Sequence, residues 1–436
     1  MKTNILRQIF FDENQHWESF KRKHGERIRP VVIKEVERFR DCGNPKNGFK
    51  LFVCEGCNDP RKVPYRCKGR FCTTCSLGES EEWSRLLTED VLQVNHRHVI
   101  FTIDGCLWEI FLLHRHLLKP LMDEAAKLIS DYFRKKSKVK VGIIAGLHTF
   151  GSKVNFNPHV HMLVTMGGIT KKGEWKGYDF IPFKMLRKQW QAVVLKLIRK
   201  HLTGKEKKRV QPYLQQAFSK NGEGFYVHAP KQRGKVKNQL RYIGRYMRRP
   251  AIGLNRIEAY DGQYVTFKYI DKADKQEKHE TLTVEEFISC LIHHIPDEQF
   301  KTIRHYGIYS RRSKSLSKQI LATWQQVRRR WILKVRKTLR RQTWRERVIA
   351  SGQKDPMICP HCKNYYEYMG EVCPKDGKLE IKVALTTEAR NYMERVINDL
   401  ESIKPEPQKR EKKKEKRNRP LTFEEDLCQL SLFGVS

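Results

Sequence analysis

Two histidines flank a single valine in the stretch of residues 156–164, Phe-Asn-Pro-His-Val-His-Met-Leu-Val. An Asn-Pro turn signal precedes an apolar run, which is typical of a β-strand. Because side chains alternate along a strand, His159 and His161 would share one face, and Val160 and Met162 would enter the core on the other. Two imidazoles on one face of a rigid strand supply half of a divalent-metal site; an ordinary pair of strand histidines is the alternative.

Two other His-x-His pairs serve as controls. His114 and His116 lie in an apolar stretch that reads as a helix, where residues i and i+2 diverge by about 200° and cannot share a metal ion. His96 and His98 flank Arg97, whose charge opposes a nearby cation. The sequence therefore favours His159 and His161 as the metal-binding pair.

A basic helix is predicted over residues 237–250, where Pro250 stops it. Tyr242 and Tyr246 are separated by four residues and share one helical face. A tyrosine can serve as a covalent nucleophile, and guanidinium groups bind phosphate through paired hydrogen bonds. An amphipathic helix with two packing tyrosines is the alternative. The predicted phosphate-binding residues are Arg241, Arg245, Arg248 and Arg249.

Together these stretches resemble the HUH endonucleases, in their two-tyrosine branch. Further motifs, in matching order, are similar to the transposases of rolling-circle insertion sequences, the insertion-sequence ninety-one type. The resemblance spans roughly residues 30 to 310, and its motifs lie at residues 147–151, 157–161, 242–246, 256–262 and 303–307.

The resemblance implies an α+β fold, with an antiparallel sheet flanked by helices. It implies that Tyr242 and Tyr246 nick and rejoin single DNA strands through a 5′-phosphotyrosine, with Mg2+ or Mn2+ held by His159 and His161. The substrate would be single-stranded or locally melted DNA at the element ends. Because no Walker-type loop is present, a host helicase is implied.

A third metal ligand is usual in this class, and two residues are candidates. His148 would lie on the strand paired with the two histidines, and one of two hairpin registers places it on their face. A strand-end histidine that contacts DNA is the alternative. Gln239, one turn before Tyr242, is a weaker candidate.

Cysteine pairs precede this region. Two Cys-x2-Cys pairs about fifteen residues apart predict one structural zinc ion bound by Cys54, Cys57, Cys72 and Cys75. Cys67 could replace one of these ligands, and Cys42 is a weaker choice. The segment resembles the zinc-binding domain that precedes the catalytic domain in this transposase family. Buried free cysteines are the alternative.

A second candidate zinc element lies near the C-terminus. The Cys-Pro-His-Cys segment supplies Cys359 and Cys362, and the return half supplies Cys373 with Asp376 as a fourth ligand, since oxygen also binds zinc. A metal-free loop is an equally open interpretation.

The chain carries a net charge of +38 over 436 residues, which calls for a polyanionic partner such as nucleic acid. It shows neither an apolar run of 18 residues nor a signal-peptide core, so we expect no membrane partner and a cytoplasmic, nucleoid-associated protein. An unbalanced basic helix is predicted over 311–350 for phosphate contact.

The last residues, 404–436, are predicted to be a disordered basic tail. Its end resembles the pentapeptide by which bacterial proteins dock on the replication sliding clamp, with Gln429, Leu430, Leu432 and Phe433 as the binding residues. A tail end that packs on its own domain is the alternative.

These predictions divide the chain into an N-terminal helix and zinc-binding domain (1–94), a catalytic domain (95–310), the basic arm (311–350), the second candidate zinc element with a helix (351–403) and the tail. Two other functions stay open: a plasmid replication initiator or relaxase of the same class, and a non-catalytic zinc-containing nucleic-acid-binding protein.

Overall fold

A computed structural model describes residues 4–92, 94–178, 180–229, 236–247, 250–271, 274–310, 342–350 and 354–402. The chain divides into two units. Residues 1–76 and 342–436 belong to the first, and residues 77–341 to the second, which contains the histidine and tyrosine stretches. Each unit combines helices with antiparallel strands, so the predicted α+β class is confirmed.

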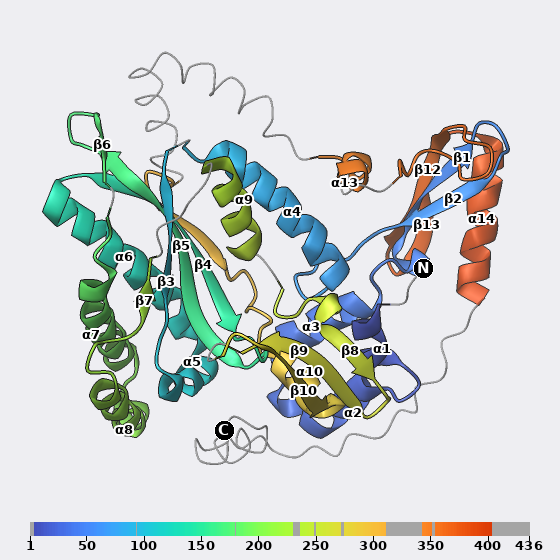
Figure 1. The fold of residues 1–436 in the computed structure, drawn as a ribbon. Coiled ribbons are helices and arrows are strands. Elements are labelled where there is room, and N and C mark those ends of the chain that lie inside the picture. The colour runs from blue at the N-terminus through green and yellow to red at the C-terminus, as the bar shows by residue number, and fades with distance from the viewer. Residues whose placement is uncertain are drawn as a thin grey trace. The chain divides into compact units, whose positions relative to one another are not determined.

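The second unit is built on a six-stranded sheet in the order β11-β4-β5-β3-β7, with β6 paired to β5 (Figure 1). Every pair of neighbouring strands is antiparallel. The strands are β3 (His96–Phe101), β4 (Lys140–Phe150), β5 (Phe156–Ile169), β6 (Trp175–Gly177), β7 (Val227–His228) and β11 (Ile303–Gly307). The long central strand β5 carries the two histidines, as predicted.

One face of this sheet holds the main core. Val160, Met162 and Val164 on β5 are buried there, which confirms the predicted alternation. Their exclusion from water, at about 25 cal/mol per Å² of apolar surface, stabilises the strand and thereby the histidines between them. The helices that cover this face are α5 (Trp108–Leu113), α6 (Leu118–Ser137), α7 (Phe183–His201) and α8 (Gly204–Lys220).

The other face is covered by α4 (Thr73–Asp90) and α9 (Val236–Met247). The buried residues Leu240, Ile243 and Met247 recur along α9 at helical spacing and pack over the sheet. Close approach depends on Gly146 of β4, because a Cβ atom there would lie 3.0 Å from Cε of Met247 and 3.5 Å from its carbonyl oxygen. The tyrosine helix thus lies directly on the face that carries the histidines.

A smaller sheet follows in the order β10-β9-β8, formed by β8 (Ile257–Tyr260), β9 (Tyr264–Ile270) and β10 (Glu277–Thr283). Asp261 and Gly262 form the turn between β8 and β9, with Gly262 at a φ of 96°. Thr283 and Glu286 form a capping box at the start of α10 (Val284–Ile292).

The first unit contains three N-terminal helices, α1 (Ile5–Phe11), α2 (His16–His24) and α3 (Pro30–Arg40). Its four-stranded sheet, in the order β13-β12-β1-β2, joins segments from both ends of the chain. The strands are β1 (Phe49–Cys54), β2 (Pro60–Pro64), β12 (Tyr366–Lys375) and β13 (Lys378–Ala384).

The helix α14 (Thr387–Ser402) buries Ala389, Met393 and Val396 against this sheet, and α13 (Trp344–Ala350) precedes the C-terminal strands. The sequence predicts that residues 351–403 lie apart from the N-terminal zinc-binding region. The structure differs, because every residue of β1 pairs with β12.

Several predictions lie outside the described residues. These are the basic arm up to residue 341, Arg248, Arg249 and the tail with its terminal pentapeptide, together with the side chains of Gln239, Arg245 and Tyr246. None of the described helices is both long and apolar enough to cross a membrane.

Candidate metal and tyrosine site

Three histidines meet on the α9 face of the sheet. His148 on β4 lies opposite His159 on β5, and His161 lies opposite Gly146. One ring nitrogen from each histidine lies within 4.8 Å of the others. Of the two hairpin registers that the sequence left open, the structure has the one that puts His148 on the same face as the pair.

The second nitrogen of each ring is held by a neighbour. Nδ1 of His159 donates to the carbonyl oxygen of Asn157 at 2.7 Å, and Nε2 of His148 donates to that of Met247 at 3.2 Å. Nδ1 of His161 lies 2.9 Å from Nε2 of His98. Such contacts fix the tautomer and orientation of a metal-binding imidazole. The three rings thus present one nitrogen each toward a common point, a donor set that fits a divalent cation.

His98 was not selected from the sequence. Burial lowers the pKa of His98 to about 4, and repulsion from His228 and His159 contributes, so the ring is neutral and can accept a hydrogen bond from His161. The sequence disfavours His98 as a metal ligand, and the histidine group indeed does not include it. The reason was incomplete, however, because neighbours along a strand point to opposite faces and Arg97 therefore points away from His98. The same alternation would have placed His98 correctly, given the pairing of β3 with β5.

The tyrosine helix reaches this cluster through its last turn. The carbonyl of Met247, the final residue of α9, is the one that accepts from His148. Tyr242 lies five residues earlier and is 58% exposed. Arg241 is also exposed at its side chain, while its carbonyl accepts from Oγ of Ser84 at 2.7 Å. The helix therefore presents a phenol toward solvent from a backbone bonded to the histidine site.

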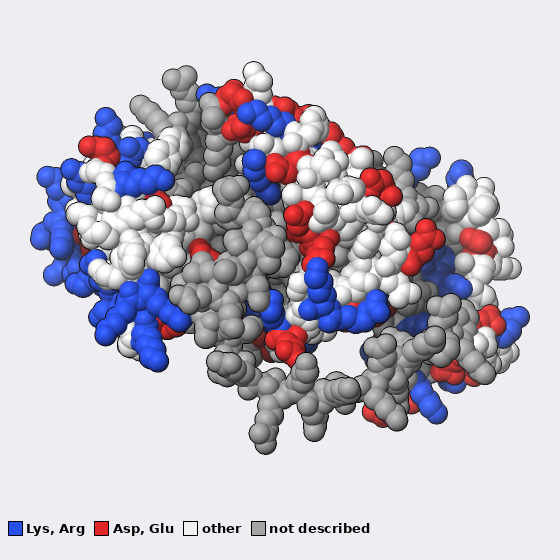
Figure 2. All heavy atoms as spheres, turned by 90° about the horizontal axis from the view of Figure 1, so that it is seen from below, with Lys and Arg blue, Asp and Glu red and all other residues white. Residues whose placement is uncertain are grey.

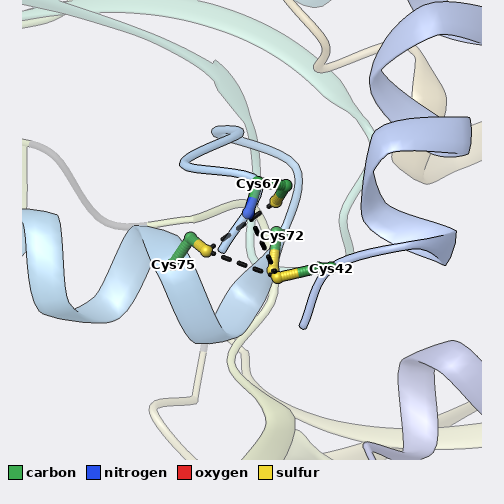
Figure 3. Close-up of side chains that lie close together, drawn as sticks. All are labelled: Cys42, Cys67, Cys72 and Cys75. Carbon is green, nitrogen blue, oxygen red and sulfur yellow. Dashed lines mark hydrogen bonds between the residues drawn. The ribbon is translucent and has the colours of Figure 1, made fainter. Parts of the chain in front are cut away.

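A cluster of four cysteines lies at the start of α4 (Figure 3). The sulfur of Cys42 is 3.6 Å from those of Cys75 and Cys72, and the sulfur of Cys67 is 3.7 Å from that of Cys75. A tetrahedral zinc ion with thiolates at about 2.3 Å has sulfur–sulfur edges of about 3.8 Å. These four residues fit a closed structural zinc site.

This grouping corrects the predicted ligand set. Cys72 and Cys75 are joined by Cys67, the proposed substitute, and by Cys42, the weaker choice. Cys54 and Cys57 lie elsewhere, because β2 runs between Cys57 and Cys67 and its five residues span about 17 Å. Local spacing identified the ligand pairs but not their partners.

The second candidate zinc element is corrected as well. Cys359 and Cys362 group with Cys54 and Cys57. Cys373 and Asp376 do not join them: the sulfur of Cys373 lies 3.7 Å from the hydroxyl of Tyr65, and Asp376 occupies the turn after β12 with a φ of 49°. The strand β12 separates this turn from the Cys359 knuckle.

Two known protein families match long segments of the chain. A family described as "Putative transposase" matches residues 142–316, and a family described as "Transposase zinc-binding domain" matches residues 13–103. No solved structure matches the chain significantly.

Two relatives cover most of the chain. The transposase for insertion sequence element IS801 of Pseudomonas savastanoi pv. phaseolicola is 27% identical over 317 residues, 69% of this chain and 75% of its own. The "Putative transposase y4qJ" of Sinorhizobium fredii strain NBRC 101917 / NGR234 is 26% identical over 292 residues, 62% of this chain and 72% of its own. The family matches, these relatives and the order of the motifs agree that the chain belongs to the transposases of the insertion-sequence ninety-one type.

Proposed function

We propose that this transposase nicks and rejoins single DNA strands through a 5′-phosphotyrosine intermediate during rolling-circle transposition. The observation that carries the proposal is the hydrogen bond between His148 and the last turn of the tyrosine helix. It joins a three-imidazole cluster to a helix that bears two tyrosines four residues apart. The net charge of +38 suits a DNA substrate.

In the proposed step, the phenolic oxygen of a tyrosine forms a bond to the phosphorus atom of the scissile linkage. The bond from phosphorus to the 3′ oxygen breaks, and the leaving oxygen takes up a proton while the phenol loses one. The products are a 5′-phosphotyrosine and a free 3′-hydroxyl. Because the phosphodiester energy is retained, the reverse attack by a 3′-hydroxyl rejoins a strand without ATP.

His148, His159 and His161 would hold the divalent cation, which when bound polarises the scissile phosphate. Their donor set consists of nitrogen atoms, whereas Mg2+ prefers oxygen ligands. We therefore expect Mn2+ to support cleavage at lower concentration than Mg2+.

The two tyrosines would act in turn. The Met247 carbonyl that contacts His148 adjoins Tyr246 in the chain, while Tyr242 lies one turn farther along the helix axis, about 6 Å away. We propose that Tyr246 makes the first attack and that Tyr242 receives the second strand. The Tyr246→Phe variant should then lose first-strand cleavage, whereas Tyr242→Phe should still cleave but fail to transfer.

A nicking assay tests the chemistry. Single-stranded oligonucleotides covering the element ends are incubated with the full chain and Mn2+, and denaturing gels resolve a covalent protein–DNA adduct. The adduct should disappear in the double variant Tyr242→Phe/Tyr246→Phe and in His159→Ala/His161→Ala. Wild-type protein that binds these strands without forming an adduct would favour a non-catalytic DNA-binding protein. Cleavage confined to a plasmid origin would favour a replication initiator or relaxase.

Two host partners complete the proposal: a helicase that exposes single strands, and the replication sliding clamp, bound by Gln429, Leu430, Leu432 and Phe433. These terminal residues lie outside the described part of the chain. Deleting 429–433 should abolish retention of the protein on immobilised clamp while leaving cleavage of oligonucleotides unchanged. Undiminished retention would refute the clamp contact.

A further inference from the structure

We infer that a second structural zinc ion, bound by Cys54, Cys57, Cys359 and Cys362, joins the two ends of the chain into one folded unit. The matched zinc-binding family ends at residue 103, so this ligand set extends far beyond it. The sulfur of Cys54 lies 3.2 Å from that of Cys362, and the sulfur of Cys57 lies 3.6 Å from that of Cys359. Four sulfurs at such distances fit tetrahedral thiolate zinc.

The two Cys-x2-Cys segments have the same backbone geometry. The amide of Cys54 donates to the carbonyl of Asp59 at 3.0 Å, and the amide of Cys359 donates to that of Asn364 at 2.8 Å. Each bond joins a cysteine to the fifth residue after it. The fourth residue after each first cysteine also has positive φ, 57° at Asn58 and 67° at Lys363. Two equivalent knuckles, 305 residues apart, thus face one another.

Contacts between the knuckles fix their separation. The amide of Glu55 donates to the carbonyl of Tyr365 at 3.1 Å, and the hydroxyl of Tyr366 donates to the carboxylate of Asp59 at 2.6 Å. The knuckles approach closely at Gly56, where a Cβ atom would lie 1.9 Å from Nδ2 of Asn364. The strands β1 and β12 continue from the knuckles as neighbours in the sheet. The site is thus built by the fold rather than by chance proximity.

Zinc content tests the site in the full-length protein. Elemental analysis should give two zinc ions per chain in the wild type and one in Cys359→Ser/Cys362→Ser. The control Cys373→Ser should retain two, because Cys373 lies outside the site although it comes from the same C-terminal segment. Retention of two zinc ions by the double variant, or a single zinc ion in the wild type, would overturn the inference.

Thiol alkylation of the wild-type protein provides a test that does not depend on a variant folding. Cys57 and Cys362 are exposed in the structure. Bound zinc should nevertheless protect both from iodoacetamide, and a chelator should make both reactive, as read by mass spectrometry. Rapid alkylation of these two cysteines while zinc stays bound would contradict the site.

A second, independent observation concerns single-stranded DNA, and it rests on the proposed function. Ile100 of β3 pairs with His161 on one side and with His228 on the other. Cross-strand partners point to the same face, so His228 lies on the face of the metal cluster. Tyr226, two residues before it, shares that face and is 49% exposed.

These residues form an aromatic and basic ledge, which we define as Tyr226, His228 and Arg187. The rings of Tyr226 and His228 are stacked, with centroids 5.7 Å apart and an interplanar angle of 14°. The guanidinium of Arg187 lies 4.8 Å from the Tyr226 ring centroid. We propose that an unpaired base next to the scissile linkage stacks on this ledge and that Arg187 contacts its phosphate.

Fluorescence anisotropy separates this proposal from catalysis. The parent protein is Tyr242→Phe/Tyr246→Phe, and binding to a labelled single-stranded oligonucleotide is measured in EDTA. Replacing Tyr226 by Ala should weaken binding by about 5- to 150-fold, the range for loss of one base–aromatic stack. Replacing it by Phe should restore binding.

Tyr264 is the matched control, because it is a tyrosine of similar exposure, 46%, on β9 of the smaller sheet. Tyr264→Ala should leave affinity unchanged. If Tyr226→Ala binds as tightly as the parent, the ledge is wrong while the proposed function stands. A parent protein without affinity for single strands would instead contradict the proposed function.

Discussion

His98 shows how a residue outside the proposed ligand set can govern a metal site. Its Nε2 atom holds Nδ1 of His161 at 2.9 Å and so fixes which nitrogen of His161 would face a bound cation. Removing such an orienting partner typically weakens metal affinity by about 10- to 100-fold. In His98→Ala, the Mn2+ concentration for half-maximal cleavage should rise by this factor, with the maximal rate largely recovered at high Mn2+.

The control for His98→Ala is His116→Ala, which removes an exposed histidine. This control should not shift the Mn2+ dependence. If His98→Ala lowers the maximal rate without changing the Mn2+ requirement, the residue does not act through the metal site.

The surroundings of His96 lead to a prediction about how the stability of the fold depends on pH. Its Nδ1 donates to the carbonyl of Val94 at 2.7 Å, and its Nε2 accepts from the hydroxyl of Tyr309 at 2.6 Å, an arrangement that requires a neutral ring. Burial lowers the pKa of His96 to about 4 from an ordinary value of 6.5, and burial raises the pKa of Tyr309. Both groups are therefore neutral in the folded protein at neutral pH.

Because the pKa of His96 is lowered on folding, the unfolded chain binds the proton first as pH falls. Stability should be constant above pH 6.5 and should fall between pH 6.5 and 4, by up to about 3 kcal/mol for this group. Urea unfolding of His96→Gln should show lower stability at pH 7.5 but a shallower loss toward pH 4. An unchanged slope would contradict the assignment.

At the scale of the element, α9 is positioned by glycine. A Cβ atom on Gly244, between the two tyrosines, would lie 2.8 Å from Oγ and 3.1 Å from Cα of Ser84 on α4. Gly244→Ala should therefore destabilise the protein by about 1–3 kcal/mol through overpacking, although alanine favours helices. It should also lower cleavage, because a shift of α9 away from α4 displaces the Met247 carbonyl that contacts His148.

Gly78 of α4 is the matched control, since a Cβ atom there would meet no atom within 4 Å. Gly78→Ala should stabilise the protein by up to about 1 kcal/mol through helix propensity alone. If packing against α4 determines the effect, urea unfolding should show a lower free energy of unfolding for Gly244→Ala and a higher one for Gly78→Ala. A stabilised Gly244→Ala would show that the two helices separate easily.

The same elements show what could be predicted from sequence. The shared face of His159 and His161 was predictable, because the two-residue period of a strand is a local property. The position of His148 was not, since two registers that differ by one residue give opposite faces and only the full sheet selects one. The position of α9 on the sheet could not be predicted either, because the close approach at Gly146 depends on packing between segments that are distant in the sequence.

At the scale of the whole molecule, the grouping of the cysteines into two sites could not be predicted from the sequence. A Cys-x2-Cys spacing defines half of a zinc site, and any two halves can combine on chemical grounds. The choice is made by the sheet, in which β1 lies beside β12 from the other end of the chain. The two halves nearest in sequence were therefore the wrong pair to join.

The positive charge of the molecule is concentrated on part of its surface. Lys and Arg side chains gather over α7 and α8 (Figure 2). Lys205, Lys207 and Lys208 lie exposed in the first turns of α8, where they oppose the helix dipole, and they form no ion pair among the described residues. A placement that disfavours the helix and leaves the charges without a partner suits phosphate contact.

The dependence of DNA binding on salt tests this surface. Each phosphate contact with single-stranded DNA contributes about 0.7 to the slope of log Kobs against log salt concentration. Replacing Lys205, Lys207 and Lys208 by Gln in the cleavage-deficient Tyr242→Phe/Tyr246→Phe protein should therefore reduce the slope by about 2. Anisotropy titrations of a single-stranded oligonucleotide at several salt concentrations measure it.

A second triple variant removes the same charge from the β8–β10 sheet and its neighbouring loop, through Lys153→Gln, Lys268→Gln and Lys278→Gln. These lysines already pair with carboxylates, at 3.0 Å to Glu280, 3.5 Å to Glu277 and 2.6 Å to Asp271, respectively. Because their charges are offset within the protein, their loss should leave the slope nearly unchanged. If the slope falls equally in the two triple variants, DNA binding depends on the net charge alone. If the slope of the α8 variant equals that of the parent protein, the DNA strand does not contact these three lysines.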